Sequence, residues 1–189
     1  TTVSRLPLHM ATRAMAIRMA GMAMTPSITR MSGPSSTAQA LPDEGIAPPL
    51  DGATQWLNSK PLGEQDLRGK VVLVDFWTYA CINCIRTLPH VKRWAEQYTP
   101  QGLTVVGVHT PEFPFERPTA NVEAAMRRHG VKHPVAQDNR YGTWKAYSNQ
   151  YWPATYLIDA QGRIRYKHFG EGEYERTEGV IRTLLAARG

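Results

Sequence analysis

The chain has 189 residues, enough for one domain of ordinary size and a tail. Hydrophobic residues make up 42% of it and charged residues 20%, as in globular rather than disordered proteins. The net charge is +6, and residues 1–42 supply +4 of it, because they contain four arginines and no acidic residue. The rest of the chain is nearly neutral and has no basic stripe with interleaved aromatic residues, so nucleic acid is not an expected partner.

Residues 1–42 are predicted to form a disordered or weakly ordered N-terminal tail outside the fold. This segment is rich in Ala, Met, Ser, Thr and Arg, and residues 32–36 resemble a linker. It is interpreted as a targeting segment, a flexible tether, or sequence left by cloning or by the choice of start site. Neither the tail nor the rest of the chain offers the ~20 apolar residues that a membrane span needs.

The tail also contains six of the seven methionines, whose thioethers are soft ligands suited to Cu(I). This raises an alternative function, a periplasmic copper-binding or copper-delivery protein that uses the tail together with the cysteines. A Met- and Ala-rich leader or a short amphipathic helix explains the composition as well and is favoured, since ligand softness is the sole support for copper. The methionines are Met10, Met15, Met19, Met22, Met24 and Met31.

Residues 43–189 are predicted to form one α/β domain with a central, mostly parallel sheet, because strand and helix patterns alternate along them. Apolar runs predict strands over 71–77 and 103–109, and a brief strand over 133–136. Helical spacing follows residue 84 to about 98 and recurs over 121–129, around 141–147 and over 175–187. Residues 154–159 and 163–169 are predicted to pair as a hairpin through a short loop that contains Gly162.

The two cysteines, Cys81 and Cys84, lie where the strand over 71–77 gives way to a helix. A helix N-terminus carries partial positive charge, so a cysteine there ionises more easily, and the thiolate is the reactive form. A zinc site is disfavoured, because two cysteines cannot form a four-cysteine site. The His129/His133 pair begins 45 positions after Cys84, far beyond the usual spacing of about 12 residues.

Three separated motifs resemble the thioredoxin superfamily, specifically its TlpA-like extracytoplasmic branch and the periplasmic domain of DipZ-type proteins. The resemblance covers about residues 43–189 and implies a thioredoxin-like fold, a central mixed sheet flanked by helices. DipZ-type proteins also have a membrane electron-carrying domain that has no counterpart here. The motifs are Phe76-Trp77-Thr78-Tyr79-Ala80-Cys81-Ile82-Asn83-Cys84, Gly107-Val108-His109-Thr110-Pro111-Glu112-Phe113 and Tyr151-Trp152-Pro153-Ala154.

The resemblance and the local chemistry together predict a thiol:disulfide oxidoreductase. Cys81 is expected to attack as the exposed thiolate and Cys84 to resolve the mixed disulfide, so the pair forms a redox-active disulfide. Asp75, in an otherwise apolar strand, is expected to be buried, with a raised pKa suited to accepting the proton of Cys84. Trp152 and Pro153 resemble the cis-proline loop and are expected to bind substrate, although an ordinary strand-entry proline remains open.

The resemblance further implies a reductant outside the cytoplasm, periplasmic or membrane-tethered, that acts on protein thiols and disulfides. Its electron donor is expected to be a membrane protein of the CcdA or DipZ type, and neither a cofactor nor a metal is expected. Oxidase or isomerase activity remains open, because the reduction potential depends on thiolate stabilisation. A thiol peroxidase is a weak alternative, since Val74 stands where the peroxidase pattern Pro-x-x-x-Thr-x-x-Cys has its proline.

Three further side-chain groups could belong to the site. Glu112 could tune the thiols from the end of a strand, although a solvated loop position is favoured. Among the histidines, His90 alone is close enough in sequence to Cys84 to be a candidate. Trp77, Tyr79 and Trp152 could form an apolar rim for peptide-like partners, and core packing explains Trp77 equally well.

Overall fold

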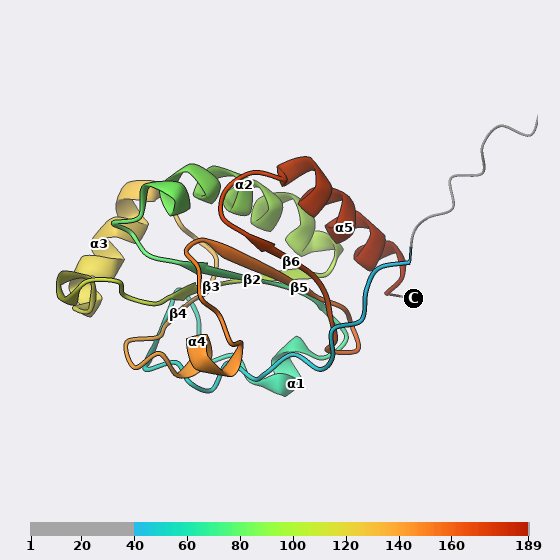
Figure 1. Ribbon diagram of the computed structural model, residues 1–189, viewed down its shortest axis with the longest axis horizontal. Helices are drawn as coiled ribbons and strands as arrows, with labels where there is room; N and C mark the ends of the chain where they lie inside the picture. Colours follow the sequence, from blue (N-terminus) through green and yellow to red (C-terminus); the bar gives the residue numbers. More distant parts are fainter. Residues whose placement is uncertain (1–39, 189) are drawn as a thin grey trace, which may run out of the picture. The chain divides into compact units, whose positions relative to one another are not determined.

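The computed structural model describes residues 40–188, and these form a six-stranded mixed sheet with helices on both faces (Figure 1). The strand order is β1-β4-β3-β2-β5-β6. The strands are β1 (Gln55–Leu57), β2 (Val71–Trp77), β3 (Leu103–His109), β4 (Val135–Gln137), β5 (Ala154–Ile158) and β6 (Ile164–Phe169). The helices are α1 (Glu64–Leu67), α2 (Ile82–Tyr98), α3 (Thr119–His129), α4 (Gly142–Ala146) and α5 (Tyr174–Ala186).

Strand β2 lies in the middle of the sheet, and all seven of its residues are buried. It pairs in parallel with β3, to which α2 connects it, and antiparallel with β5. A strand buried on both faces needs apolar side chains in both directions, which explains the nearly continuous apolar run over 71–77. Asp75 is the one ionisable residue in this run.

The two faces of the sheet are covered differently. Helices α2, α3 and α5 lie on one face, where alternate β2 residues such as Val71 and Leu73 pack against Val91, Trp94 and other residues. The opposite face carries Val72, Val74 and Phe76 and is covered by α1, α4 and the chain before β2. Because strand side chains alternate, Asp75 and Trp77 point to the α2 face.

The predicted strands and helices are found, with shifts of one or two residues at several ends. The sheet is mixed, as the resemblance implied, and the expectation of a mostly parallel sheet is wrong, because three of its five strand pairs are antiparallel. The predicted hairpin over 154–169 forms as antiparallel β5 and β6. Strand β4 begins at Val135 rather than His133, and α3 begins at Thr119 rather than Asn121. The sequence analysis did not predict β1 or α1, which have three and four residues, too few for a periodic pattern.

Residues 41–47 lie along β6 and extend the edge of the sheet. The amide of Glu44 donates to the carbonyl oxygen of Ile164 at 3.0 Å, and the amide of Ile164 donates to Gly45 at 2.9 Å. Arg163 forms an ion pair with Asp43 at 2.6 Å. Residues 41 and 42, which were predicted to belong to the tail, therefore lie along the sheet together with residues 43–47. The rest of the predicted tail, residues 1–39, lies outside the described residues.

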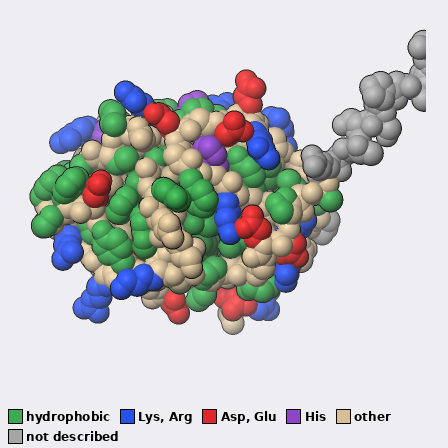
Figure 2. Space-filling view, in the orientation of Figure 1, with side chains coloured by type: hydrophobic (Ala, Val, Ile, Leu, Met, Phe, Trp, Pro, Cys, Tyr) green, Lys and Arg blue, Asp and Glu red, His purple; other side chains and the backbone are tan. Residues whose placement is uncertain are grey.

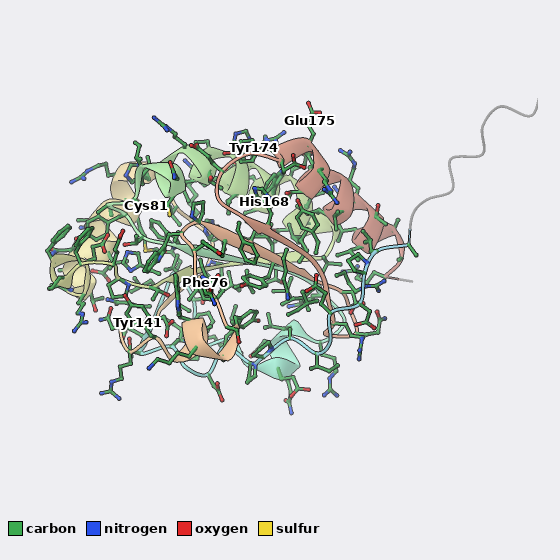
Figure 3. All side chains as sticks on the ribbon, viewed as in Figure 1. Phe76, Cys81, Tyr141, His168, Tyr174 and Glu175 are labelled. Carbon is green, nitrogen blue, oxygen red and sulfur yellow. The ribbon has the colours of Figure 1, made fainter. Side chains whose placement is uncertain are left out.

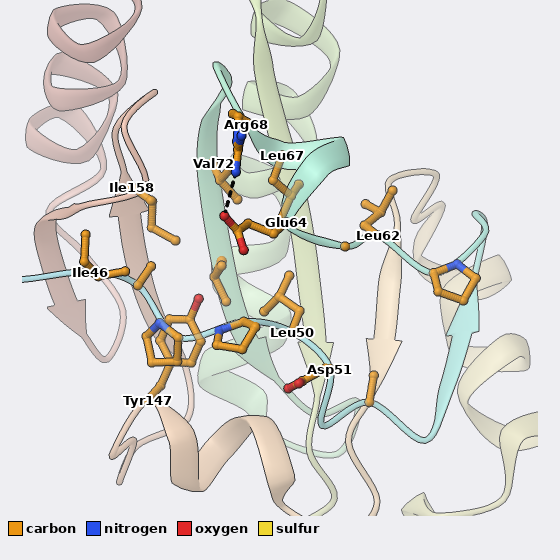
Figure 4. Close-up of a pocket in the computed structure, with 18 of the residues that line it drawn as sticks. Ile46, Leu50, Asp51, Leu62, Glu64, Leu67, Arg68, Val72, Tyr147 and Ile158 are labelled. Carbon is orange, nitrogen blue, oxygen red and sulfur yellow. Dashed lines mark hydrogen bonds and ion pairs between the residues drawn. The ribbon is translucent and has the colours of Figure 1, made fainter.

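A cleft of about 1250 Å³ lies on the α1 face of the sheet (Figure 4). Its wall combines the chain before β2, including Leu50 and Leu62, with sheet residues Val72 and Ile158 and with Tyr147 after α4. Neither cysteine lines it, so this cleft is separate from the thiols. None of the helices within residues 40–188 has the length and apolar character that crossing a bilayer requires.

Candidate active site

Cys81 and Cys84 lie at the start of α2, at the end of the sheet to which β2 leads (Figure 3). Cys81 is the N-cap residue of α2, and its Sγ accepts a hydrogen bond from the amide of Cys84 at 3.4 Å. Both cysteines are reduced; Cys81 is partly exposed, whereas Cys84 is only 2% exposed. An anion on Cys81 would therefore be stabilised by the helix N-terminus and accessible to a partner.

Cys84 is the protected member of the pair. It packs in a cluster with Trp77, Leu88 and Val122, between the sheet and helices α2 and α3. Burial, together with the neighbouring thiol of Cys81, raises the pKa of the Cys84 thiol well above its usual range. Cys84 therefore stays protonated, whereas Cys81 is partly exposed to solvent.

Asp75 is buried on the α2 face of β2, as predicted, with an exposed fraction of 2%. Its Oδ1 forms no hydrogen bond with any described residue. Burial raises the pKa of Asp75 to about 8. The negative charge of ionised Asp75 also contributes to the raised pKa of Cys84. The protonation of one group therefore affects the protonation of the other.

The loop before β5 faces Cys81. The peptide bond between Trp152 and Pro153 is cis. The carbonyl oxygen of Trp152 accepts a long hydrogen bond from the Cys81 thiol, 3.9 Å from Sγ. The indole nitrogen of Trp152 donates to the carbonyl oxygen of Thr110 at 3.0 Å, which holds the loop against the end of β3. The structure thus brings Cys81, Cys84, Asp75 and this loop together.

The suggested apolar rim is only partly found. Tyr79 and Trp152 are partly exposed beside Cys81, but Trp77 is buried at 1% exposure and belongs to the core. Among residues 40–188, five of the six large exposed hydrophobic side chains lie on segments around the thiols: Ile82, Phe113, Phe115, Tyr151 and Phe169. Figure 2 shows hydrophobic side chains gathered on the left of this face, where Figure 1 places α3 and the start of α2.

Phe113 and Phe115 stack on each other with ring centroids 5.5 Å apart. The Tyr79 hydroxyl donates to the carbonyl oxygen of Phe115 at 2.8 Å, which joins this pair to the loop before Cys81. On the other side, Tyr151 lies 5.1 Å from Phe169, next to the Trp152–Pro153 bond. The two exposed aromatic pairs are therefore attached to the two loops that adjoin Cys81, the one before it and the one at Trp152.

Glu116, rather than the candidate Glu112, is the glutamate that lies beside the redox pair, and no sequence pattern predicted it. Glu112 is exposed, as the favoured interpretation held, whereas Glu116 is completely buried beside the loop that leads to Cys81. The short 3₁₀ turn Pro114–Glu116 directs its side chain inward. Nothing in the sequence distinguishes the two glutamates, because both belong to the same Pro- and Phe-containing loop.

None of the histidines within residues 40–188 forms a hydrogen bond with the sulfur of Cys81 or Cys84. The ring of His90 stacks on Tyr174 at 3.6 Å, so it belongs to the contact between α2 and α5. His109 and His133 are buried, and burial lowers the pKa of each to about 4. They are therefore neutral at ordinary pH.

Comparison with known proteins identifies the chain. Residues 47–167 match the AhpC/TSA family. The chain belongs to this family. Proteins named DipZ from Mycobacterium bovis and Mycobacterium tuberculosis are 50% identical to it over 159 residues. That alignment covers 82% of this chain but only 23% of the length of DipZ.

Two further comparisons fix the fold and the class of activity. Thiol-disulfide oxidoreductase YkuV of Bacillus subtilis is 29% identical, over 74% of this chain and 93% of YkuV. The solved structure of a thioredoxin-like superfamily protein matches with a TM-score of 0.68 and 28% identity, over 74% of this chain and 96% of that one. The predicted thioredoxin-like fold and thiol:disulfide oxidoreductase class are confirmed.

The copper hypothesis gains no support. Its six methionines lie outside the described residues. Within residues 40–188, no group of three or more His, Cys, Asp or Glu side chains is arranged to hold a metal ion. Of the relatives compared above, YkuV is named a thiol-disulfide oxidoreductase, and neither YkuV nor DipZ is named a copper protein.

Proposed function

We propose that the protein reduces disulfide bonds in other proteins, outside the cytoplasm, through a dithiol–disulfide cycle of Cys81 and Cys84. The observation that carries this proposal is the asymmetry of the pair. Cys81 is partly exposed and accepts a helix N-terminal hydrogen bond at 3.4 Å, while Cys84 is buried one turn further on. An exposed attacking thiol and a protected second thiol are what a two-step exchange needs.

The cycle transfers two electrons to the client. The Cys81 thiolate attacks one sulfur of the client disulfide, the client S–S bond breaks, and the other client sulfur leaves as a thiolate. Cys84 then loses its proton and attacks Sγ of Cys81, which breaks the mixed disulfide and releases the second client thiolate. The client thiolates take up two protons, and the protein is left with a Cys81–Cys84 disulfide.

Asp75 is the proposed proton acceptor for Cys84. Cys84 cannot attack as a thiol, and its burial keeps water from taking the proton efficiently. Asp75, whose pKa is raised to about 8 by burial, has a proton affinity matched to working near neutral pH. In the proposed cycle it receives the proton as the mixed disulfide is resolved.

The client is proposed to be a protein segment that lies in extended form beside Trp152 and Pro153. The exposed pairs Phe113–Phe115 and Tyr151–Phe169 offer apolar contacts on either side of the thiols. Because the chain is similar to DipZ, a membrane electron donor of the CcdA or DipZ type is proposed to return electrons to the disulfide. No metal or cofactor takes part in the proposed cycle.

The test is reduction of insulin by the full chain, together with the reduction potential of the cysteine pair. Cys81→Ser should abolish activity, whereas Cys84→Ser should form a mixed disulfide with the client that persists, because nothing resolves it. The potential should lie well below about −200 mV, as in reductants. Full activity of Cys81→Ser would contradict the cycle, and a potential well above that value would contradict the reducing direction.

A further inference from the structure

Glu116 is a buried carboxyl group next to the redox pair, and the cycle described above does not use it. Its exposed fraction is 0%, and it lies in the loop between β3 and α3. None of the ion pairs formed within residues 40–188 includes it. Burying a charge without a cation costs free energy unless hydrogen bonds replace those lost with water. The hydrogen-bond partners of Glu116 therefore decide whether its carboxyl group is ionised or protonated.

All four hydrogen-bond partners of Glu116 are donors. Oε1 accepts from the Thr78 hydroxyl and from the amide of Ala80 at 3.1 Å. Oε2 accepts from the amides of Glu112 at 2.7 Å and Phe113 at 2.8 Å. Amides cannot accept a proton from a carboxyl group, and both oxygens already receive two donors. This arrangement suits an ionised carboxylate, since three of the four partners are amides that can only donate and the Thr78 hydroxyl is the one partner that could accept a proton.

The neighbouring histidine does not neutralise this charge. Because the Thr78 hydroxyl gives its proton to Glu116, its oxygen is free to accept from Nε2 of His109, 3.4 Å away. That bond assigns the proton of His109 to Nε2. The buried ring is neutral, with a pKa lowered to about 4, so the negative charge of Glu116 is not compensated there.

Glu116 is also tied to the turn that positions Cys81. It holds the amide of Ala80, the residue before Cys81, and the hydroxyl of Thr78. The amide of Cys81 in turn donates to the carbonyl oxygen of Thr78 at 3.3 Å. A fixed negative charge therefore lies behind the turn from which the attacking sulfur projects.

We propose that Glu116 is a positioning residue that biases the Cys81–Cys84 pair toward the disulfide, and so makes the protein a stronger reductant. A thiolate on Cys81 is repelled by the carboxylate, whereas the disulfide carries no charge and is not. Thioredoxin-like proteins become oxidants when their reduced form is stabilised, so destabilising the thiolate acts in the opposite direction. This inference rests on the proposed cycle and concerns its direction.

The test compares Glu116→Gln, which removes the charge at nearly constant size, with Glu112→Gln, which removes an exposed charge from the same loop. Each full-length variant is equilibrated with glutathione buffers. Glu116→Gln should shift the equilibrium toward the dithiol by about threefold to tenfold, which is about 15–30 mV. The pH profile for alkylation of Cys81 should move to lower pH, and Glu112→Gln should change neither quantity by more than about 1.5-fold.

Equal values for Glu116→Gln and the parent protein, with the variant folded, would overturn the proposal. The ¹³Cδ resonance of Glu116 in the parent protein gives a second measurement that does not depend on the variant folding. It should lie at the ionised position at pH 7, and a protonated position there would also overturn the proposal. Because the glutathione equilibrium involves no protein client, failure to reduce insulin would count against the proposed function alone.

Discussion

At the scale of single residues, burial divides the chemistry between the two cysteines. Cys81 caps the helix and is open to a partner, whereas Cys84, one helical turn later, is enclosed by the contact of α2 with α3. Asp75 is enclosed on the same face of the sheet. Burial therefore raises the pKa of both Asp75 and Cys84, while Cys81, within ten positions of Asp75 in the chain, stays open to solvent.

Asp75 makes stability depend on pH in a direction that can be checked. Its pKa is about 8 in the folded protein and about 3.8 without burial. Burial favours the protonated form, so its contribution to stability is full below pH 4 and is lost as pH rises through 8. We expect Asp75→Asn to remove this loss, which amounts to at most about 1.4 kcal/mol per pH unit.

The measurement is urea unfolding at pH 5, 7 and 9 with Cys81→Ser and Cys84→Ser present in both proteins, so that no thiol titrates. The free energy of unfolding should fall with pH more steeply when Asp75 is present than in the Asp75→Asn variant. Parallel pH dependences would mean that Asp75 is ionised in the folded protein at neutral pH.

The sequence predicts some of these residues and cannot predict others, for physical reasons. Asp75 is identifiable because it interrupts an apolar strand, and Cys81 and Cys84 because a strand–helix junction surrounds them. Glu112 and Glu116 are equivalent in sequence, and only the turn at Pro114–Glu116 and four donors from two loops decide which is buried. Two of these donors, Thr78 and Ala80, lie 38 and 36 positions from Glu116, so the selection depends partly on contacts that are distant in sequence.

At the scale of elements, the loop between β3 and α3 is proposed to present a surface to the client. Buried Glu116 anchors it, and Phe113 and Phe115 are exposed at 45% and 55%. We expect replacing both phenylalanines by serine to lower kcat/KM for an unfolded client disulfide about tenfold, since the partner loses apolar contact. Reduction of a small aromatic disulfide reagent should change less than about twofold, because the thiols are untouched.

The matched control is Ile46→Ser. Ile46 is also a large exposed hydrophobic residue, at 66%, but it lies beside the cleft on the α1 face rather than near the thiols. It should leave the reduction of both substrates unchanged. An equal loss for the client disulfide in both proteins would show a general effect of surface hydrophobicity, not a docking surface at Phe113 and Phe115.

Long elements are predictable here, whereas the short elements β1 and α1 are not. The apolar run of β2 and the helical spacing of α2 and α5 predict those elements within one or two residues. Strand β1 forms because Trp56 pairs with Ala136 of β4, across about 80 positions. Three residues carry no period of their own, so such an edge strand depends on tertiary pairing.

At the scale of the whole molecule, the described fold is completed by residues 41–47 along the edge of β6. Three backbone hydrogen bonds join this segment to β6 and the turn before it. The side chain of Arg165 also donates to the carbonyl oxygens of Leu41 and Pro42. Without the segment, β6 would present unpaired backbone groups to solvent, and an exposed edge strand favours association with other chains.

A chain that begins at Ala40 should therefore be as stable as the full chain, within about 0.5 kcal/mol, whereas one that begins at Pro48 should be destabilised. Three lost backbone hydrogen bonds correspond to roughly 2–4 kcal/mol. Urea unfolding of the three chains measures the difference, and light scattering detects association through the freed edge.

If the chain from Ala40 lost as much stability as the chain from Pro48, residues 1–39 would belong to the cooperative fold, contrary to the predicted division into tail and redox domain. Equal stability of all three would instead mean that the edge of β6 needs no partner, and that the contacts of Asp43 and Arg163 add nothing to folding.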